Sequence, residues 1–240
     1  MPQPLYAIGD IHGQIDMLTE ALARIHHHGG VDAKIVFVGD LVDRGPDSRA
    51  VIDLLITGQA QGRNWIALKG NHDRLFADFL TDGTTHSPLS SSGASWLSPR
   101  MGGDTTLASY GVTVGDPATT HAAAIAAIPP EHQAFIHALP TYHIDGNLLF
   151  VHAGIRPGIA LADQSEDDLI WIREPFHSYL DPHPWLVVHG HASLDAPCHY
   201  GNRVNIDSGA GHGRLLTAAL FDDNSVSILT ATGPIPLRPT

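Results

Sequence analysis

The first 75 residues repeat one pattern three times. Each repeat has a run of four apolar residues, then a polar motif that contains glycine, then apolar residues at helical spacing. The three runs are Leu5–Ile8, Ile35–Val38 and Trp65–Leu68. Continuous apolar runs that alternate with amphipathic helices predict buried strands of an α/β fold. Asp47 or Ser48 is expected to cap the second helix.

The pattern then changes. Residues 81–101 are rich in Ser, Thr, Gly and Pro, which predicts a long surface loop or lid. Residues 102–138 are mainly helical in character, and Pro129–Pro130 is expected to start a helix. No composition boundary separates these residues from their surroundings. We therefore expect a single domain over residues 1–240, with a helical and loop insertion at about 81–138.

The last hundred residues turn to β-structure. Thr141–Ile144 and Leu148–Val151 flank an Asp-Gly-Asn turn, which predicts a hairpin. Four further strands are predicted at Leu186–Val188, Arg203–Ile206, Leu215–Phe221 and Val226–Leu229. The last two are joined by a turn at 222–224.

Polar residues that can bind metals recur directly after these strands. They are Asp10, His12, Asp40, Asn71, His152 and His191. Ligands of α/β sheets bind beyond the carboxyl ends of the strands. Oxygen and imidazole donors without thiolates suit Mn, Fe, Zn or Ni. A carboxylate such as Asp40 can bridge two ions, and two metals roughly 3.5–4 Å apart stabilise phosphoryl transfer.

The ordinary alternative is that these residues only shape turns. A single Asp or His after a strand is usually a turn or cap residue. Here three glycine-flanked motifs and two histidine–glycine motifs all follow strands, and chance rarely produces such a set. The pattern therefore favours a site.

Five motifs together resemble the calcineurin-like metallophosphoesterases. They are Asp-x-His-Gly at 10–13, Gly-Asp-x-Val-Asp-Arg-Gly at 39–45, Gly-Asn-His-Asp at 70–73, His-Ala-Gly at 152–154 and Gly-His at 190–191. The Val-Asp-Arg-Gly element is typical of the phosphoprotein phosphatase branch. That branch includes bacterial and phage serine/threonine phosphatases and symmetrical diadenosine tetraphosphatases. The resemblance implies a four-layer αββα sandwich, with two mixed β-sheets flanked by helices.

The resemblance also implies roles for individual residues. Asp10, His12 and Asp40 would hold one metal, and Asp40, Asn71, His152 and His191 the other. His72 would be the general acid oriented by Asp43, while Arg44 and Arg173 would clamp the phosphate. A metal-bridging hydroxide would attack the phosphorus. Manganese is the expected metal, with iron, zinc or nickel left open. General chemistry agrees, since histidine titrates in the right range and arginine matches phosphate bidentately.

Three positions depart from the family pattern. Asp73 stands where the phosphatase branch usually has Glu, and Ser193 stands where many members of the superfamily have a second metal-binding histidine. His189 replaces an apolar residue. We expect it to support a ligand through a hydrogen bond, with direct metal binding as the alternative. His212 is a possible further neighbour of the site.

The expected activity is hydrolysis of phosphoserine or phosphothreonine on proteins, with phosphotyrosine left open. The alternative is symmetrical hydrolysis of diadenosine tetraphosphate, and a non-catalytic metal or phosphate-binding module is a third hypothesis. The formal net charge of −12 argues against binding to nucleic acid or to an anionic membrane. No apolar stretch is long enough for a membrane span, and no signal peptide is recognisable, so the expected location is the cytoplasm. No regulatory subunit is implied. Cys198 is expected to be a small core residue without a catalytic role.

Overall fold

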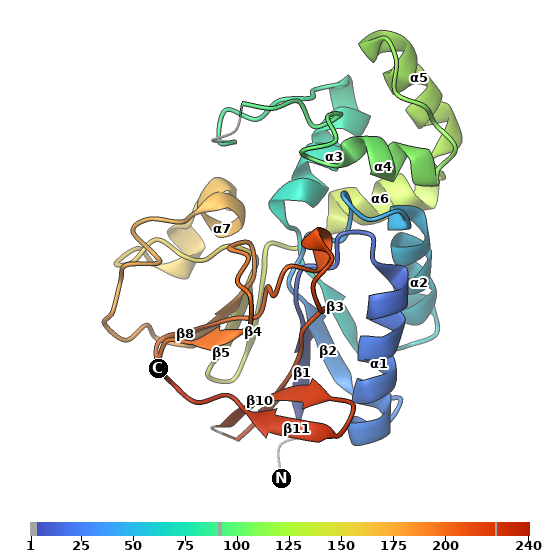
Figure 1. Ribbon diagram of the computed structural model, residues 1–240. Coiled ribbons are helices and arrows are strands. Elements are labelled where there is room, and N and C mark those ends of the chain that lie inside the picture. Colours follow the sequence, from blue (N-terminus) through green and yellow to red (C-terminus); the bar gives the residue numbers. More distant parts are fainter. Residues whose placement is uncertain (1–3, 91–92, 224) are drawn as a thin grey trace.

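The computed structural model describes residues 4–90, 93–223 and 225–240. The predicted Ser90–Gly93 run and the turn at 222–224 therefore fall partly outside the described residues. Figure 1 shows two sheets, with α1 (Ile15–Gly29) and α2 (Ser48–Ala60) beside one sheet and α7 (Glu166–Trp171) beside the other.

In the described part of the chain, the first sheet has six strands in the order β11-β10-β9-β1-β2-β3. Their bounds are β1 Leu5–Ile8, β2 Lys34–Phe37, β3 Trp65–Ala67, β9 Ala218–Asp222, β10 Ser225–Thr230 and β11 Gly233–Pro236. The strands β1, β2 and β3 run parallel, whereas β9 pairs antiparallel with β1. This parallel trio matches the three apolar runs of the sequence.

The second sheet has the order β4-β5-β6-β8-β7, again counted over the described residues. Its strands are β4 Tyr142–Asp145, β5 Leu148–Val151, β6 Leu186–His189, β7 Cys198–His199 and β8 Arg203–Asn205. The strands β5, β6 and β8 are parallel to one another. The predicted hairpin is present as the antiparallel pair β4–β5. Both sheets are therefore mixed, as the family resemblance implied.

The helices divide into two groups. One group covers the sheets and consists of α1 Ile15–Gly29, α2 Ser48–Ala60 and α7 Glu166–Trp171. The insertion contributes α4 Gly103–Ser109, α5 Pro117–Ala127 and α6 Pro130–Ala138, which follow α3 Asn71–Asp82. Short 3₁₀ turns occur at η1 Leu161–Asp163 and η2 Ala210–His212. Figure 1 shows α3 to α6 gathered at one end of the molecule.

Side chains alternate between the two faces of each strand and so fill three separate layers. Tyr6 and Ile8 of β1 pack toward the helices, whereas Leu5 and Ala7 pack toward the second sheet. In the second sheet, the side chain of Phe150 points between the sheets, while neighbouring side chains pack against α7. Three buried layers between four layers of structure confirm the αββα sandwich.

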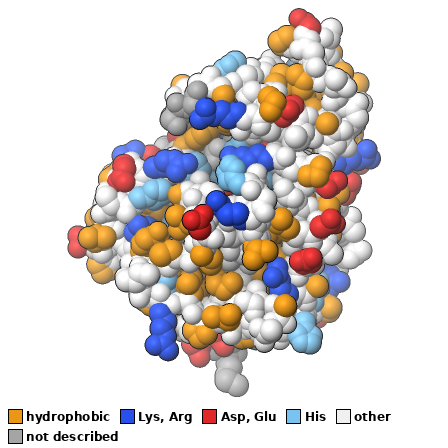
Figure 2. Space-filling view, viewed as in Figure 1, with side chains coloured by type: hydrophobic (Ala, Val, Ile, Leu, Met, Phe, Trp, Pro, Cys, Tyr) orange, Lys and Arg blue, Asp and Glu red, His pale blue; other side chains and the backbone are white. Residues whose placement is uncertain are grey.

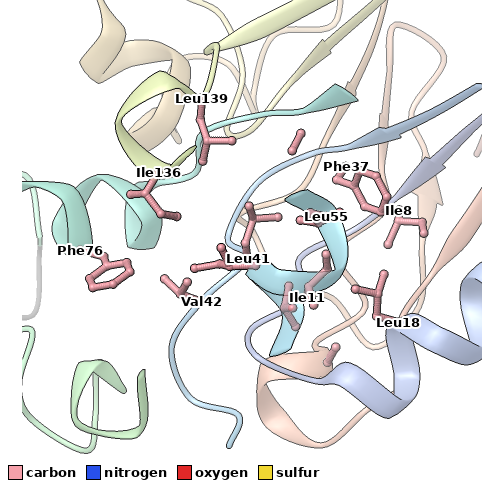
Figure 3. Close-up of a cluster of buried hydrophobic side chains, with 14 of the residues drawn as sticks. Ile8, Ile11, Leu18, Phe37, Leu41, Val42, Leu55, Phe76, Ile136 and Leu139 are labelled. Atoms are coloured by element: carbon pink, nitrogen blue, oxygen red, sulfur yellow. The ribbon is translucent and has the colours of Figure 1, made fainter. Parts of the chain in front are cut away.

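The insertion shares its core with the first sheet. Figure 3 shows Ile136 and Leu139, from α6 and just after it, near Phe76 of α3 and Leu41 of the loop after β2. These residues belong to one continuous hydrophobic cluster that also contains Ile8. The insertion is therefore packed onto the site-bearing loops, and the single-domain assignment stays a prediction that this packing supports.

Some local predictions differ from the structure. Asp47 occupies the N-cap position of α2, but its side chain makes no capping hydrogen bond. The strand predicted at Leu215–Phe221 begins only at Ala218. Leu215 lies before it and is 78% exposed. Cys198 is half-buried in the short strand β7 and is not a core residue. No helix within the described ranges has both the length and the apolar character that crossing a bilayer requires.

Candidate metal centre

The structure brings the six predicted metal ligands together. Asp10 and His12 follow β1, Asp40 follows β2, and Asn71 begins α3 directly after β3. His152 and His191 follow β5 and β6 of the other sheet. These are parallel strands whose carboxyl ends meet at one edge of the sandwich. All six side chains are buried except that of His191, which is half-buried.

The carboxylate of Asp40 faces two different histidines. Its Oδ1 lies 3.4 Å from Nε2 of His152, and its Oδ2 lies 3.5 Å from Nε2 of His12. Burial alone would raise the pKa of Asp40, but the imidazoles of His152, His72 and His12 outweigh burial and hold this pKa below its usual range. A carboxylate that is ionised and presents one oxygen to each side has the geometry of a bridge between two cations.

Backbone carbonyls fix which nitrogen of each histidine faces the cluster. Nδ1 of His12 donates to Val42 O and Nδ1 of His152 donates to Val38 O, each at 2.9 Å. Each Nε2 is then left with a lone pair, as metal ligation requires. Nε2 of His152 also lies 3.0 Å from Oδ1 of Asn71. Two acceptors at that distance repel each other unless they share a cation, so this donor set fits divalent metals.

A second carboxylate, that of Asp10, completes the cluster. It accepts the backbone N–H of His191 at 3.0 Å. Burial, together with the charges of Asp207 and Asp40, raises the pKa of Asp10 well above its usual value. Such crowding of carboxylates is relieved when a cation binds between them.

Asp207 is a site residue to which the sequence analysis gave no role. It follows β8, lines the same pocket as the predicted ligands, and is 4% exposed. Burial raises its pKa, and Asp40 raises it further. The signal was available, because Asp207 is a carboxylate shortly after a predicted strand.

Backbone strain is concentrated here. In the described chain, six residues other than glycine have positive φ, and five of them are His12, Asp40, Asp43, Arg44 and His191. A left-handed conformation costs such residues on the order of 1–3 kcal/mol each. Five of these six strained residues therefore lie in loops that position site residues.

Gly70 is a glycine because its backbone lies very close to the side chain of Asp40. A Cβ atom on Gly70 would lie 2.2 Å from Oδ1 of Asp40. Any larger residue at position 70 would therefore displace the bridging carboxylate or the loop that carries it.

The predicted acid pair is also assembled. Nδ1 of His72 donates to Oδ2 of Asp43 at 2.7 Å, and both side chains are buried. Burial would lower the pKa of His72, but the charge of Asp40 and the hydrogen bond to Asp43 outweigh burial and raise this pKa. In this arrangement Nη2 of Arg44 donates to Nε2 of His72 at 3.0 Å, because a guanidinium has only donors. Nε2 can carry a proton toward the pocket once Arg44 turns to a bound phosphate.

Asp73, which departs from the family pattern, has a clear structural role. Its Oδ1 accepts the backbone N–H of Leu41 and its Oδ2 accepts that of Gly70, at 2.9 and 2.8 Å. The side chain thus ties the loop after β2 to the start of α3. Burial and the charge of Asp40 raise the pKa of Asp73 to about 7.

His189 and His212, which the sequence analysis placed near the site, do not take positions like those of the predicted ligands. His189 packs its ring edge-on against Phe176 at 5.1 Å, and its Nδ1 donates to Gly190 O at 3.0 Å. It belongs to neither of the carboxylate–imidazole groups whose donor atoms converge within 4.8 Å. His212, in η2, lines the pocket. The expected hydrogen bond from His189 to a metal ligand is absent among the described residues, because Nδ1 bonds to Gly190 O and Nε2 has no partner. That His189 does not bind a metal stays a prediction.

A pocket of about 750 Å³ opens over the cluster. One wall comes from residues 83–90 and 93–102, here called the lid segment, which contributes Leu89, Arg100 and Met101. The opposite wall comes from α7 and the residues after it, including Trp171 and Arg173. Nη2 of Arg173 lies 3.5 Å from His191 O. Figure 2 shows blue and pale-blue side chains gathered near the centre of this face.

Fold and site together define a metal-dependent hydrolase of phosphate esters. The sequence profile of the calcineurin-like phosphoesterases matches residues 3–229, and the chain belongs to this family. Its relatives include a protein named "Bis(5'-nucleosyl)-tetraphosphatase PrpE [asymmetrical]" from Anoxybacillus flavithermus, which is 30% identical over 95% of this chain and 94% of its own length. A "Bis(5'-nucleosyl)-tetraphosphatase, symmetrical" from Bordetella parapertussis is 40% identical over 30% of this chain and 25% of its own.

Solved structures agree on the fold. A crystal structure provisionally described as a diadenosine tetraphosphatase has a TM-score of 0.66 at 21% identity, covering 99% of this chain and 95% of its own. A cold-active protein-tyrosine phosphatase of a Shewanella species has a TM-score of 0.65 at 15% identity, with coverage of 99% and 83%. The predicted family, fold and hydrolase class are thereby confirmed.

Proposed function

We propose that this protein hydrolyses dinucleoside polyphosphates such as diadenosine tetraphosphate at a centre of two divalent metals. The observation that carries this proposal is the lining of the pocket. Arg44, Arg100, Arg173 and Trp171 all line it. The full-length relative named above supports the same substrate class.

The positive charges of these three arginines can pair with the phosphates of a substrate. In the part of the chain that the structure describes, no carboxylate pairs with Arg44, Arg100 or Arg173. The acidic residues of α7 on the opposite wall have partners instead, since Asp168 pairs with Arg156. Arg44 and Arg173 would hold the reacting phosphate, so Arg100 is left for a further phosphate of a longer chain.

Trp171 can support a nucleobase. It is half-buried and packs edge-on against the ring of His191, with centroids 6.2 Å apart. Stacking of a base on an aromatic side chain contributes roughly 1–3 kcal/mol. A pocket of this volume is also within the usual range for small-molecule sites.

The roles of the remaining residues follow the cluster geometry. Asp10, His12 and Asp40 would hold one ion, and Asp40, Asn71, His152 and His191 the other. These oxygen and imidazole donors suit Mn, Fe, Zn or Ni, and the family resemblance makes manganese the expected metal. When bound, the ions would activate water and neutralise phosphoryl charge. Arg44 and Arg173 would orient the phosphate. His72 would supply a proton from Nε2 to the leaving oxygen, and Asp43 would hold its ring in place.

Phosphoserine or phosphothreonine on proteins is a second candidate, favoured by a specific observation. The fully hydrogen-bonded His72–Asp43 pair can protonate an alkoxide, which is a poor leaving group. A phosphoanhydride releases a stable anion and needs this proton less. The cytoplasmic location and the absence of nucleic-acid and regulatory partners stay predictions.

A comparison of kcat/KM for diadenosine tetraphosphate, a phosphoserine peptide and 4-nitrophenyl phosphate tests the proposal. We expect the first substrate to be preferred, and Arg100→Gln or Trp171→Leu to raise its KM by about tenfold, with little effect on 4-nitrophenyl phosphate. Arg238→Gln, at an exposed position outside the pocket, is the control. Preference for the phosphopeptide, with both variants neutral, would overturn the proposal in favour of a protein phosphatase.

A further inference from the structure

One carboxylate oxygen joins the lid segment to the acid pair. Oδ2 of Asp43 accepts the hydrogen bond from Nδ1 of His72 and a second one, also at 2.7 Å, from the indole Nε1 of Trp96. Trp96 belongs to the lid segment, 53 residues further along the chain. Both Asp43 and Trp96 are fully buried.

The indole is held rigidly by its surroundings. Its ring stacks on Phe76 of α3, with centroids 5.6 Å apart, and contacts Phe79 at 4.9 Å. The backbone N–H of Trp96 donates to Thr85 O, and its carbonyl accepts from Gly103 N–H. A donor fixed in this way sets the position of the oxygen that receives it.

A second donor fixes the other oxygen of the same carboxylate. Oγ1 of Thr106, in α4, donates to Oδ1 of Asp43 at 2.7 Å. Asp43 also has a φ of 74°, a backbone conformation that its neighbours must sustain. The insertion thus supplies a hydrogen-bond donor to each carboxylate oxygen of Asp43.

We infer that Trp96 is a positioning residue for proton donation: by fixing Oδ2 of Asp43, it aims Nε2 of His72 at the leaving oxygen. This inference rests on the proposed acid role of His72. It also gives the lid segment a part in the reaction, since the segment that lines the substrate pocket orients the proton donor as well. A misplacement of about 1 Å at a reacting group can cost on the order of a hundredfold in rate.

The alternative is that Trp96 has only a packing role in the hydrophobic core. A buried indole N–H needs some acceptor, and Asp43 could serve merely as that acceptor. The two possibilities differ in their dependence on the leaving group. A misaligned acid slows the release of a poor leaving group, whereas a general loosening of the core affects all substrates alike.

The test compares kcat on glycerol phosphate, an alkyl ester, with kcat on 4-nitrophenyl phosphate. Trp96→Phe keeps the aromatic packing and removes the donor. We expect kcat on the alkyl ester to fall by about tenfold or more, and that on the aryl ester to change by less than about twofold. Phe79→Leu, which disturbs the same indole but leaves the hydrogen bond possible, is the matched control and should show no such difference.

Thr106→Val serves as a second variant if Trp96→Phe does not fold, and it should produce the same selective loss. Equal losses on both esters, or no loss, in the variants that fold would overturn the inference. His72→Asn, measured in parallel, separates the two possible failures. A selective loss in His72→Asn without one in Trp96→Phe would refute the role of Trp96 alone, whereas no selectivity in either would refute the acid role as well.

Discussion

Gly190 lies so close to Asp10 that a Cβ atom at position 190 would come within 1.9 Å of Asp10 Oδ1. The neighbouring backbone N–H, that of His191, donates to the same carboxylate. The loop after β6 and the loop after β1 are thus pressed together, and each carries a predicted metal ligand.

Gly190→Ala should therefore weaken metal binding. The added methyl group must push Asp10 aside, and we expect the affinity for metal to fall by at least about tenfold while the fold is retained. Isothermal titration of the metal-free protein with Mn²⁺ measures this. Gly115→Ala is the control, since a Cβ atom there meets nothing within 4 Å. Identical affinities in the two variants would contradict the placement of Asp10 at the metal.

Asp40→Asn should reduce the binding of both ions, because each oxygen of Asp40 faces a different histidine. Elemental analysis after dialysis against Mn²⁺ gives the number of ions per chain. Asp78→Asn, which alters a carboxylate paired with Arg74 outside the pocket, should keep the full content. Two ions at full occupancy in Asp40→Asn would show that the bridging role is wrong.

His72→Asn should lower kcat much less for aryl phosphates than for alkyl phosphates. An aryl leaving group departs as a stable anion, whereas an alkoxide needs the proton that His72 would supply. Steady-state kinetics on the two ester types measures the difference. Equal losses on both would argue against the acid role.

His189→Phe should alter the pH dependence of stability without removing a metal. Burial lowers the pKa of His189 to about 3, so the folded chain keeps this ring neutral while the unfolded chain protonates it near its ordinary pKa of about 6.5. The free energy of unfolding must then decrease as the pH falls from about 6.5 toward 3. The variant lacks this contribution.

The slope of unfolding free energy against pH should therefore be smaller in His189→Phe by up to about 1.4 kcal/mol per pH unit. Urea denaturation of the metal-stripped proteins at several acidic pH values measures it. Unchanged slopes would show that His189 does not stay neutral in the fold. Loss of an ion from the loaded variant would instead make His189 a ligand.

The amino-acid sequence predicted the strands that carry the site, and the reason is physical. Strands such as β1 and β2 are buried on both faces, so they appear as continuous apolar runs. The following motifs need glycine and left-handed residues, which marks the loops. By contrast, β11 contains two prolines and β7 has only two residues, so neither leaves a periodic signal.

The role of Trp96 could not be predicted in the same way. Residues 81–101 are polar in composition, and the prediction of a surface loop followed from that. Trp96 is nevertheless fully buried, because Phe76 and Phe79 of α3 form a place for its ring and Asp43 accepts its N–H. Such a contact depends on how distant segments meet, and no local pattern encodes it.

The central claim is that Asp10, His12, Asp40, Asn71, His152 and His191 form a catalytic centre for two metals. Titration of the metal-stripped protein with Mn²⁺, followed through hydrolysis of 4-nitrophenyl phosphate, tests it most directly. We predict turnover that rises with added metal and saturates at about two ions per chain. A folded protein that shows no turnover with Mn²⁺, Fe²⁺, Zn²⁺ or Ni²⁺ would contradict the claim.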